Sequence, residues 1–491
     1  MNHTVPQLRP FQVTGVQKLL QHDRFILADD MGLGKTPQAL SAIDASKFGA
    51  LVVCPTSVKN SWEDECRRWR PDIKPIVCHG LGLASFKWPS PGELVIIGYN
   101  QLPNWLNPPP HKSGYPTTEK TPEAKRRRAE LKRERKAFNK FIESQVHYAA
   151  QTIAIYDEAQ ALRDNQSARS RKCRILSAIC SKVWVLSATP MPRGDALAFY
   201  NISWAAQMEE TIFHNYPTFQ RDAGAQYDSH GTFIGYKPGP AFNRAISKYM
   251  LRRSIDEICP ELPGRQYEIK RVELNVSELT ELPHAISQAL RHAETAKELA
   301  AIRVLPEFKD FSRWRSRIAR ARIPAMLEHL DLLEENEGRS LVFSAHKAPI
   351  LALAERPGWA VIHGEDGLGS DGRQQIVRDQ EQYRGVAISI QSGGAGLNFP
   401  TFKRSLFVDL DWDFTANLQA ERRNYRITST GIEPRLYTIL TSDTEMDRLV
   451  THKMIAASFN CSVGVDGSVT AHENGFASEL DEFLNEATEN E

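Results

Sequence analysis

Short apolar runs rich in β-branched residues recur along the chain, with helical stretches between them. They lie at 25–28, 50–54, 75–78, 94–99, 152–156 and 183–187, and after a gap at 341–344, 360–363, 385–390, 405–410 and 436–440. Continuous apolar runs of this length are typical of strands buried on both faces of a parallel sheet. The pattern therefore predicts an α/β fold with two parallel-sheet lobes.

The same pattern divides the chain into parts. We expect a first lobe at 1–200, a helical region at 201–330, a second lobe at 331–460 and an acidic tail at 461–491. A basic helical insertion at 103–148 interrupts the first lobe. Within it, residues 123–136 carry eight Lys/Arg and three Glu, which suits either a grip on duplex DNA or a solvated spacer.

Bulk composition narrows the class of protein. With 491 residues, 41% hydrophobic and 25% charged, the chain resembles a globular protein of about three domains. No apolar run approaches the roughly 18 residues that span a bilayer, and no export signal is visible, so we expect a cytoplasmic protein without a membrane partner. Seven cysteines without a Cys-x-x-Cys pair argue against structural zinc. Because 61 basic and 60 acidic residues nearly cancel, a nucleic-acid surface would have to be local.

Polar residues gather where the predicted strands end, which is where open α/β sheets bind ligands. The segment "DDMGLGKT" (29–36) follows the first strand and precedes a helix. Gly32 and Gly34 would give room for phosphates, Lys35 would supply positive charge, and the Thr36 hydroxyl would ligate magnesium. A phosphate loop usually has glycine at the position of Asp29, so a plain glycine turn before a helix is the alternative.

The segment "DEAQ" (157–160) follows another apolar strand. Asp157 could hold magnesium and Glu158 could orient the attacking water, the two carboxylate tasks of phosphoryl transfer. An Asp-Glu pair after a strand is more often a helix cap. Its pairing with Lys35 and Thr36 at the same sheet edge favours the catalytic interpretation.

The ordered set of motifs resembles the Swi/Snf-type ATPases of helicase superfamily two. It comprises "LRPFQ" (8–12), "DDMGLGKT", "DEAQ", "SATP" (187–190), "QSGGAGLN" (391–398) and "QAERRNYR" (419–426). The resemblance runs from residue 8 to about 450, and the chain is as compact as bacterial or bacteriophage members, which would place it in a host cytoplasm in the second case. It implies two RecA-like lobes with helical insertions, and ATP and Mg²⁺ as cofactors. Acidic residues before Gly-x-Gly-Lys-Thr are customary in this family.

The resemblance also implies roles for individual residues. Gln12 would read adenine, and Asp30, Met31, Gly32, Leu33, Gly34, Lys35 and Thr36 would hold the nucleotide. Arg423 and Arg426 would be arginine fingers acting across the cleft, although a basic helix face in water is the alternative. Gln160, Ser187, Thr189 and Gly396 would couple the nucleotide to the polymer. The sequence departs from the family at "DEAQ" and at Thr428-Ser429 after Ile427.

The expected partner is DNA, double-stranded, forked or branched, held through its phosphates. Candidate contacts are Thr56, Ser57, Arg373, Gln374, Gln391 and Ser392, and for each of them loop capping is the alternative. The function that the sequence favours is an ATP-dependent double-stranded DNA translocase acting by branch migration, annealing or fork regression. The alternatives are a strand-separating DNA or RNA helicase and a non-hydrolysing, nucleotide-gated DNA-binding regulator.

Overall fold

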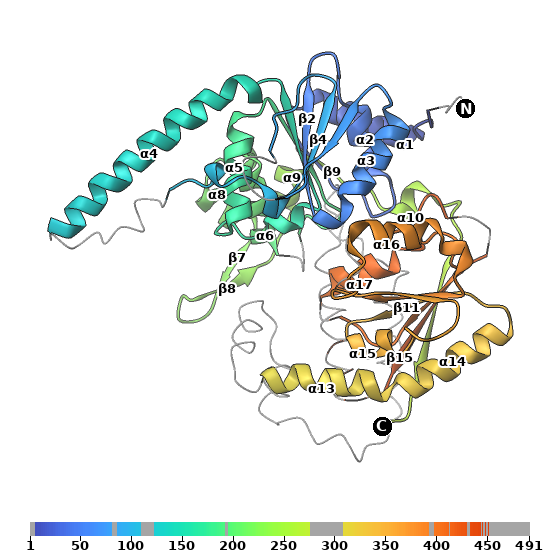
Figure 1. The fold of residues 1–491 in the computed structure, drawn as a ribbon. Coiled ribbons are helices and arrows are strands. Elements are labelled where there is room, and N and C mark those ends of the chain that lie inside the picture. Colours follow the sequence, from blue (N-terminus) through green and yellow to red (C-terminus); the bar gives the residue numbers. More distant parts are fainter. Residues whose placement is uncertain are drawn as a thin grey trace.

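The computed structural model describes residues 5–80, 86–109, 122–191, 195–274, 308–391, 397–411, 413–429 and 433–442, together with 444, 447 and 450. The described chain forms two lobes, each built on a parallel sheet (Figure 1). This confirms the predicted α/β fold.

The first lobe contains a seven-stranded parallel sheet with the order β3-β4-β2-β5-β6-β1-β9. Its strands are β1 (Arg24–Leu27), β2 (Gly49–Cys54), β3 (Lys74–Val77), β4 (Glu93–Gly98), β5 (Thr152–Asp157), β6 (Lys182–Leu186) and β9 (Met250–Leu251). Every residue of β2 is buried, because helices cover both faces of the sheet. That is why this strand is an unbroken apolar run in the sequence.

Two apolar cores flank this sheet. One packs α1 (Pro10–Gln21), α2 (Lys35–Ser41) and α3 (Lys59–Trp69) against it, through residues such as Leu19, Leu40 and Trp62. The other includes residues of α5 (Ala168–Ile179) and α6 (Ala196–Ala205). The lobe also contains α7 (Glu209–Phe213), α8 (Tyr216–Asp222), α9 (Pro240–Ser247) and the hairpin of β7 (Ala225–Tyr227) and β8 (Phe233–Tyr236).

The second lobe contains a six-stranded parallel sheet with the order β10-β15-β14-β11-β13-β12. Its strands are β10 (Arg265–Arg271), β11 (Ser340–Ser344), β12 (Trp359–Ile362), β13 (Gly385–Ser389), β14 (Arg404–Phe407) and β15 (Arg435–Thr441). Its helices are α13 (Phe308–Ala321), α14 (Ile323–Glu335), α15 (Lys347–Leu351), α16 (Gly369–Arg378) and α17 (Phe414–Glu421). Each apolar run predicted from the sequence overlaps a strand in one of the two sheets.

The expected helical region at 201–330 is not wholly helical. Strand β9 pairs with β1 and extends the first sheet, and β10 pairs with β15 and forms an edge of the second. The first lobe therefore continues to about residue 251, and the second begins at about 265. The segment between them, residues 252–264 with α10 (Ile255–Ile258), is called the interlobe connection below.

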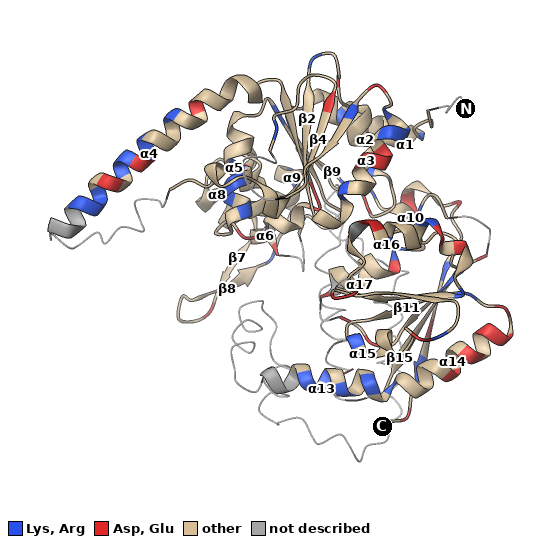
Figure 2. Cartoon of the chain, in the orientation of Figure 1, with Lys and Arg blue, Asp and Glu red and all other residues tan. Residues whose placement is uncertain are grey.

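The basic insertion forms α4 (Pro122–Ala149), which stands out from the first lobe (Figures 1 and 2). Its base is fixed by aromatic contacts: the ring centroids of Trp105 and Phe141 are 5.3 Å apart, and Trp88 Nε1 donates a hydrogen bond to Gln145 Oε1 at 3.0 Å. No helix in the described part of the chain is long and apolar enough to cross a membrane.

Candidate active site

A cavity of about 400 Å³ lies between the two lobes. Its lining includes Gln12, Met31, Gly32, Gly34, Lys35, Thr36, Trp62, Asp157 and Glu158 from the first lobe, and Asn398, Gln419, Arg423, Arg426, Ile427 and Thr428 from the second. Most of the first-lobe residues named here lie at the end of β1 or β5 or just beyond it, so they stand at the carboxyl edge of the sheet. The sequence placed the ligand site at this edge.

Gly32 and Gly34 shape the loop between β1 and α2. Their φ angles are 85° and 74°, in the left-handed region that residues with side chains disfavour. A Cβ on Gly32 would lie 3.0 Å from Cγ of Arg426, and a Cβ on Gly34 would lie 2.5 Å from Nε2 of Gln12. The glycines therefore allow Arg426 of the second lobe and Gln12 of α1 to approach the loop closely.

Lys35 brings a half-buried positive charge to this loop. Its Nζ donates hydrogen bonds to the backbone carbonyl oxygens of Asp29 at 2.8 Å and Asp30 at 3.2 Å. Burial lowers the pKa of Lys35, and nearby carboxylates, Glu158 the strongest, act in the opposite direction. The ammonium group is thus held by neutral carbonyls inside the cavity, where an anionic ligand would stabilise its charge.

Asp157 and Glu158 end β5 and face the same cavity. Asp157 Oδ2 accepts a hydrogen bond from Trp62 Nε1 at 2.7 Å, and its Oδ1 accepts one from the Glu158 backbone N–H at 2.9 Å. Burial, and then the charge of Glu158, raise the pKa of Asp157 to about 6. Glu158 has a φ of 48°, an unfavourable conformation for a residue with a side chain, and such conformations concentrate at functional sites.

The predicted coupling residues form one hydrogen-bonded chain with Glu158. Gln160 Nε2 donates to Glu158 Oε2 at 2.8 Å, and Ser187 Oγ donates to Gln160 Oε1 at 2.9 Å. The Thr189 backbone N–H in turn donates to Ser187 Oγ at 3.3 Å. The loop after β6 is thus connected to Glu158 through side-chain hydrogen bonds, and the coupling role of these residues stays a prediction. Gly396 lies outside the described residues.

Arg423 and Arg426 reach the cavity from the second lobe. They follow α17, which ends at Glu421, so they stand on a turn and not on the helix face that their spacing suggested. Burial lowers the pKa of Arg423 to about 9 and that of Arg426 to about 10, while Glu158 of the first lobe opposes both shifts. Arg423 is only 4% exposed, which rules out the alternative of a basic face in water.

The acidic residues at the start of the loop face away from the cavity. Asp29 is fully buried, and its two carboxylate oxygens accept hydrogen bonds from Nε and Nη2 of Arg253 in the interlobe connection. Asp30 Oδ2 accepts one from the Ile255 backbone N–H at 3.3 Å and lies 3.8 Å from Nη2 of Arg422 in the second lobe. The loop thus anchors both the interlobe connection and the second lobe.

Two of the expected nucleotide-binding residues turn their side chains away from the cavity, so a contact from either would have to come from its backbone N–H, and it stays a prediction. The side chains of Asp30 and Leu33 do not line the cavity, because Asp30 faces the interlobe connection and Leu33 packs in an apolar cluster with Ile255 and Tyr425. Gln12 does line it: its Nε2 donates to the Leu33 carbonyl oxygen at 3.1 Å and its Oε1 accepts from the Arg9 backbone N–H at 2.9 Å.

The predicted DNA contacts fall into two groups. Thr56 and Ser57 lie in a short helix (Thr56–Val58) that lies against α16 of the second lobe, and Gln391 follows β13. Arg373 instead makes a two-point ion pair with Asp366, at 2.9 and 3.0 Å, and donates to the His363 carbonyl oxygen.

Gln374, the neighbour of Arg373 on α16, is only 8% exposed. For Arg373 and Gln374 the structure therefore favours the capping and packing interpretation over a phosphate contact. The proposed contacts at Thr56, Ser57 and Gln391 stay predictions, and Ser392 lies outside the described residues.

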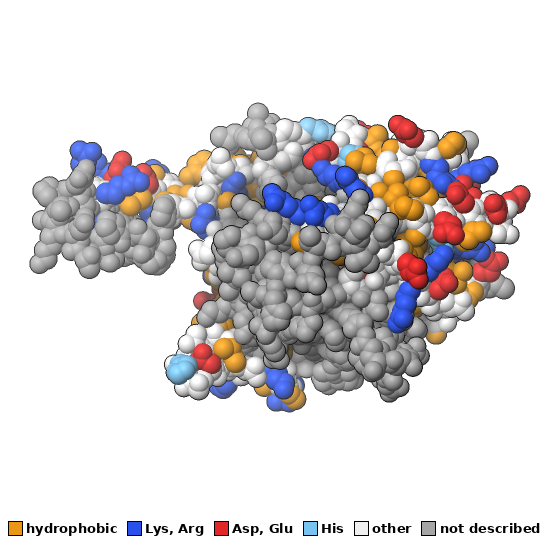
Figure 3. Space-filling model, turned by 90° about the horizontal axis from the view of Figure 1, so that it is seen from below, with side chains coloured by type: hydrophobic (Ala, Val, Ile, Leu, Met, Phe, Trp, Pro, Cys, Tyr) orange, Lys and Arg blue, Asp and Glu red, His pale blue; other side chains and the backbone are white. Residues whose placement is uncertain are grey.

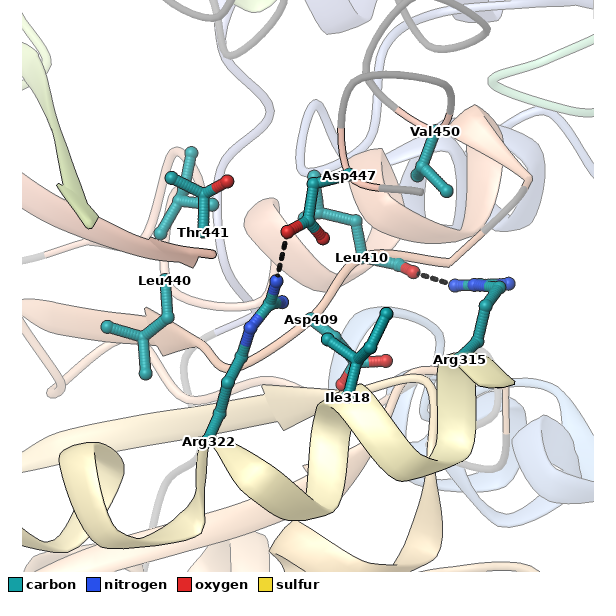
Figure 4. Close-up of a pocket in the computed structure, with 10 residues that line it drawn as sticks. Arg315, Ile318, Arg322, Asp409, Leu410, Leu440, Thr441, Asp447 and Val450 are labelled. Atoms are coloured by element: carbon teal, nitrogen blue, oxygen red, sulfur yellow. Dashed lines mark hydrogen bonds and ion pairs between the residues drawn. The ribbon is translucent and has the colours of Figure 1, made fainter. Parts of the chain in front are cut away.

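A second pocket lies where α13 crosses the ends of β14 and β15 (Figure 4). There Arg322 forms an ion pair with Asp447 at 2.5 Å, and Arg315 donates to the Leu410 carbonyl oxygen. Arg322 is only 2% exposed and also donates to the Val408 carbonyl oxygen at 3.0 Å. These contacts fasten α13 to the second sheet, so we interpret this pocket as structural.

Two parallel-sheet lobes, with a phosphate-type loop and an acidic pair on one side of the cavity and arginines on the other, define a class of helicase-like, ATP-hydrolysing enzymes. The sequence matches the SNF2-related domain over residues 11–301 and the helicase conserved C-terminal domain over residues 322–428. The chain belongs to the SNF2-related family.

Two relatives illustrate the range of similarity. The SWI/SNF-related matrix-associated actin-dependent regulator of chromatin subfamily A-like protein 1 of Xenopus tropicalis is 26% identical over 445 residues, covering 86% of this chain and 41% of that protein. The DNA annealing helicase and endonuclease ZRANB3 of Mus musculus is 24% identical over 452 residues, covering 86% and 37%. The chain therefore spans less than half the length of these relatives.

Among solved structures, the Sulfolobus solfataricus SWI2/SNF2 ATPase core in complex with dsDNA aligns with 16% sequence identity and a TM-score of 0.39. The alignment covers 89% of this chain and 88% of that one.

Proposed function

We propose that the protein is an ATP-dependent double-stranded DNA translocase that remodels forked or branched DNA by branch migration, annealing or fork regression. The observation that carries this proposal is the shared cavity, which Lys35 and Glu158 line from one lobe and Arg423 and Arg426 from the other. Chemistry that needs groups from both lobes is coupled to their relative motion.

The cavity suits a triphosphate. Five cationic residues line it, Arg9, Lys35, Arg68, Arg423 and Arg426. Burial lowers the pKa of Lys35, Arg423 and Arg426. A polyanion in their midst would relieve the cost of burying these charges. The two left-handed glycines, Gly32 and Gly34, keep side chains out of the loop that would cradle it.

Thr36 and Asp157 are the residues that would hold magnesium, and the ion would offset charge on the outer phosphates. Trp62 and the Glu158 backbone N–H fix the orientation of the Asp157 carboxylate. Glu158 would orient the attacking water, and Arg423 and Arg426 would stabilise charge in the transition state. Each of these tasks falls to a side chain that already lines the cavity.

Support for a DNA substrate comes from the relatives, one of which is named a DNA annealing helicase. Support for translocation comes from the contacts that join the nucleotide loop to the interlobe connection and the second lobe. Opening and closing of the cleft would be transmitted through these contacts to any polymer bound across both lobes.

The proposal is tested by steady-state ATP hydrolysis with single strands, blunt duplex, forks and four-way junctions, in parallel with fluorescence assays of branch migration and strand separation. We expect duplex-containing DNA to stimulate hydrolysis, and forks or junctions to be remodelled. Stimulation by RNA alone would indicate an RNA helicase instead. No turnover with any polymer would indicate a nucleotide-gated regulator.

A further inference from the structure

One face of α4 carries cations along its length. The exposed residues Arg126, Arg133, Lys136 and Lys140 fall within a sector about 80° wide on a helix of 3.6 residues per turn. We call these four residues the basic stripe. No glutamate of α4 falls inside this sector, so its charge is uniformly positive, whereas Arg127, Arg128, Lys132 and Arg135 lie on other sides of the helix.

The opposite face of α4 is the packed one. Its buried and half-buried positions are 128, 131, 135, 138, 142, 145 and 149, which repeat at intervals of three and four residues. Their centre lies about 170° from the centre of the basic stripe. The helix thus has one packed face and, opposite to it, an exposed sector in which every charged residue is cationic.

A solvated spacer would be expected to alternate its charges and pair them along the helix. The ion pair within the described part of α4 is Arg127–Glu130, and it lies off the stripe. The four stripe residues make no ion pair with a described residue. Figure 2 marks basic positions, with acidic positions between them, along α4 outward from the first lobe, and Figure 3 shows α4 standing clear of the body.

We propose that the basic stripe is a binding site for the phosphate backbone of duplex DNA, a site that deepens, and rests on, the proposed translocase function. The stripe spans about 21 Å of helix, a length over which duplex DNA carries about 12 phosphate charges. A straight, anchored row of cations matches a stiff polyanion. Between Arg126 and Lys140 the sector contains no aromatic residue that could stack on the bases of a single strand.

The anchoring of α4 supports a mechanical role for this site. The centroids of Phe86 and Trp88 are 5.1 Å apart and those of Phe86 and Trp105 are 5.5 Å apart, and this cluster holds the base of α4 through Phe141 and Gln145. Force on DNA bound along the stripe would therefore pass into the first lobe.

The test compares two double variants of the full chain. Arg133→Gln with Lys136→Gln removes two stripe cations, and Arg127→Gln with Lys132→Gln removes the same charge from exposed positions outside the stripe. Glutamine preserves helix propensity, and circular dichroism checks folding. The affinity for a blunt-ended 30-base-pair duplex is measured at several concentrations of potassium chloride.

In the stripe variant we expect the slope of log affinity against log salt concentration to become shallower by about 2. Its affinity for the duplex at about 0.1 M salt should fall roughly tenfold or more. The control should change by less than about threefold, since Arg127 and Lys132 project about 80° or more from the centre of the stripe and Arg127 is already paired with Glu130. Hydrolysis without DNA should be unchanged in both variants.

If the two variants lose duplex affinity equally, or if neither loses any, the proposal that the basic stripe binds DNA is overturned. Tighter wild-type binding to duplex RNA than to duplex DNA would overturn the choice of ligand. If the wild-type protein neither binds duplex DNA nor is stimulated by it, the proposed function itself fails, which distinguishes that outcome from failure of the stripe alone.

Discussion

Asp29 occupies the position where a phosphate loop usually has its first glycine, and its buried carboxylate holds the guanidinium of Arg253. The departure from the usual phosphate-loop motif at this position thus has a structural explanation. The residue ties the interlobe connection to the loop that Lys35 follows.

We predict that Asp29→Asn and Arg253→Gln each lower the free energy of unfolding by about 3 kcal/mol, because each leaves a buried partner without its counter-charge. In the double variant the loss should be much less than the sum of the two. Denaturant unfolding of the four proteins measures this coupling. Additive losses would show that the pair does not act as a unit.

Glu158 is the residue for which the proposed function makes the sharpest chemical prediction. We predict that Glu158→Gln lowers turnover roughly 10²- to 10⁴-fold while duplex affinity stays within about twofold, since the side chain faces the nucleotide cavity. Single-turnover hydrolysis and fluorescence anisotropy separate the two effects. Hydrolysis near the wild-type rate would falsify the water-orienting role.

Sequence reasoning found the charged residues of this site but not those that position them. Lys35, Asp157, Glu158, Arg423 and Arg426 all line the cavity, as their motifs predicted. Trp62 and Arg253 were missed, because their roles depend on contacts with residues 95 and 224 positions away in the chain. A buried tryptophan in a helix gives no sequence signal that its N–H faces a carboxylate.

At the scale of elements, continuous apolar runs predicted strands correctly, whereas the edge strands β9 and β10 were not predicted. Strand β10 alternates exposed and half-buried residues, and β9 has two residues, so neither forms a continuous apolar run. Both join a sheet through backbone pairing with a distant strand. The boundaries of the lobes were therefore misplaced, although the lobes themselves were predicted.

The β10 edge is attached to α17 by a buried acidic residue. Glu421 Oε1 accepts hydrogen bonds from Arg265 at 2.8 Å and from the Tyr267 hydroxyl at 2.6 Å. Burial alone would raise the pKa of Glu421, but Arg265, Arg422 and Tyr267 outweigh it and lower the pKa. This arrangement stabilises the turn that carries Arg423 and Arg426.

We predict that Glu421→Gln lowers the free energy of unfolding by about 3 kcal/mol at neutral pH. Because the folded-state pKa is lowered, the advantage of the wild type is present above the unfolded-state value of about 4.3 and is lost as pH falls through the folded-state value. Denaturant unfolding at pH 7 and in steps below pH 5 measures the difference. A difference that grows as pH falls would contradict this account.

At the scale of the whole molecule, the two lobes are connected by the interlobe connection and also by contacts between charged side chains. Asp64 and Arg378 approach to 3.3 Å across the seam between α3 and α16, and both are exposed. Because exposed pairs of this kind contribute little to stability, this edge is held less firmly than the buried contacts near the nucleotide loop. This pattern suits a cleft that opens and closes.

The most direct test of a cavity that needs both lobes is single-turnover ATP hydrolysis by Arg423→Ala, with Lys35→Ala as a variant of the other lobe and with nucleotide affinity measured in parallel. We predict that Arg423→Ala still binds ATP but hydrolyses it on the order of 10³-fold more slowly, or slower still. Lys35→Ala should lose both ATP binding and ATP hydrolysis. Hydrolysis by Arg423→Ala at the wild-type rate would contradict the account, because the second lobe would then take no part in the chemistry.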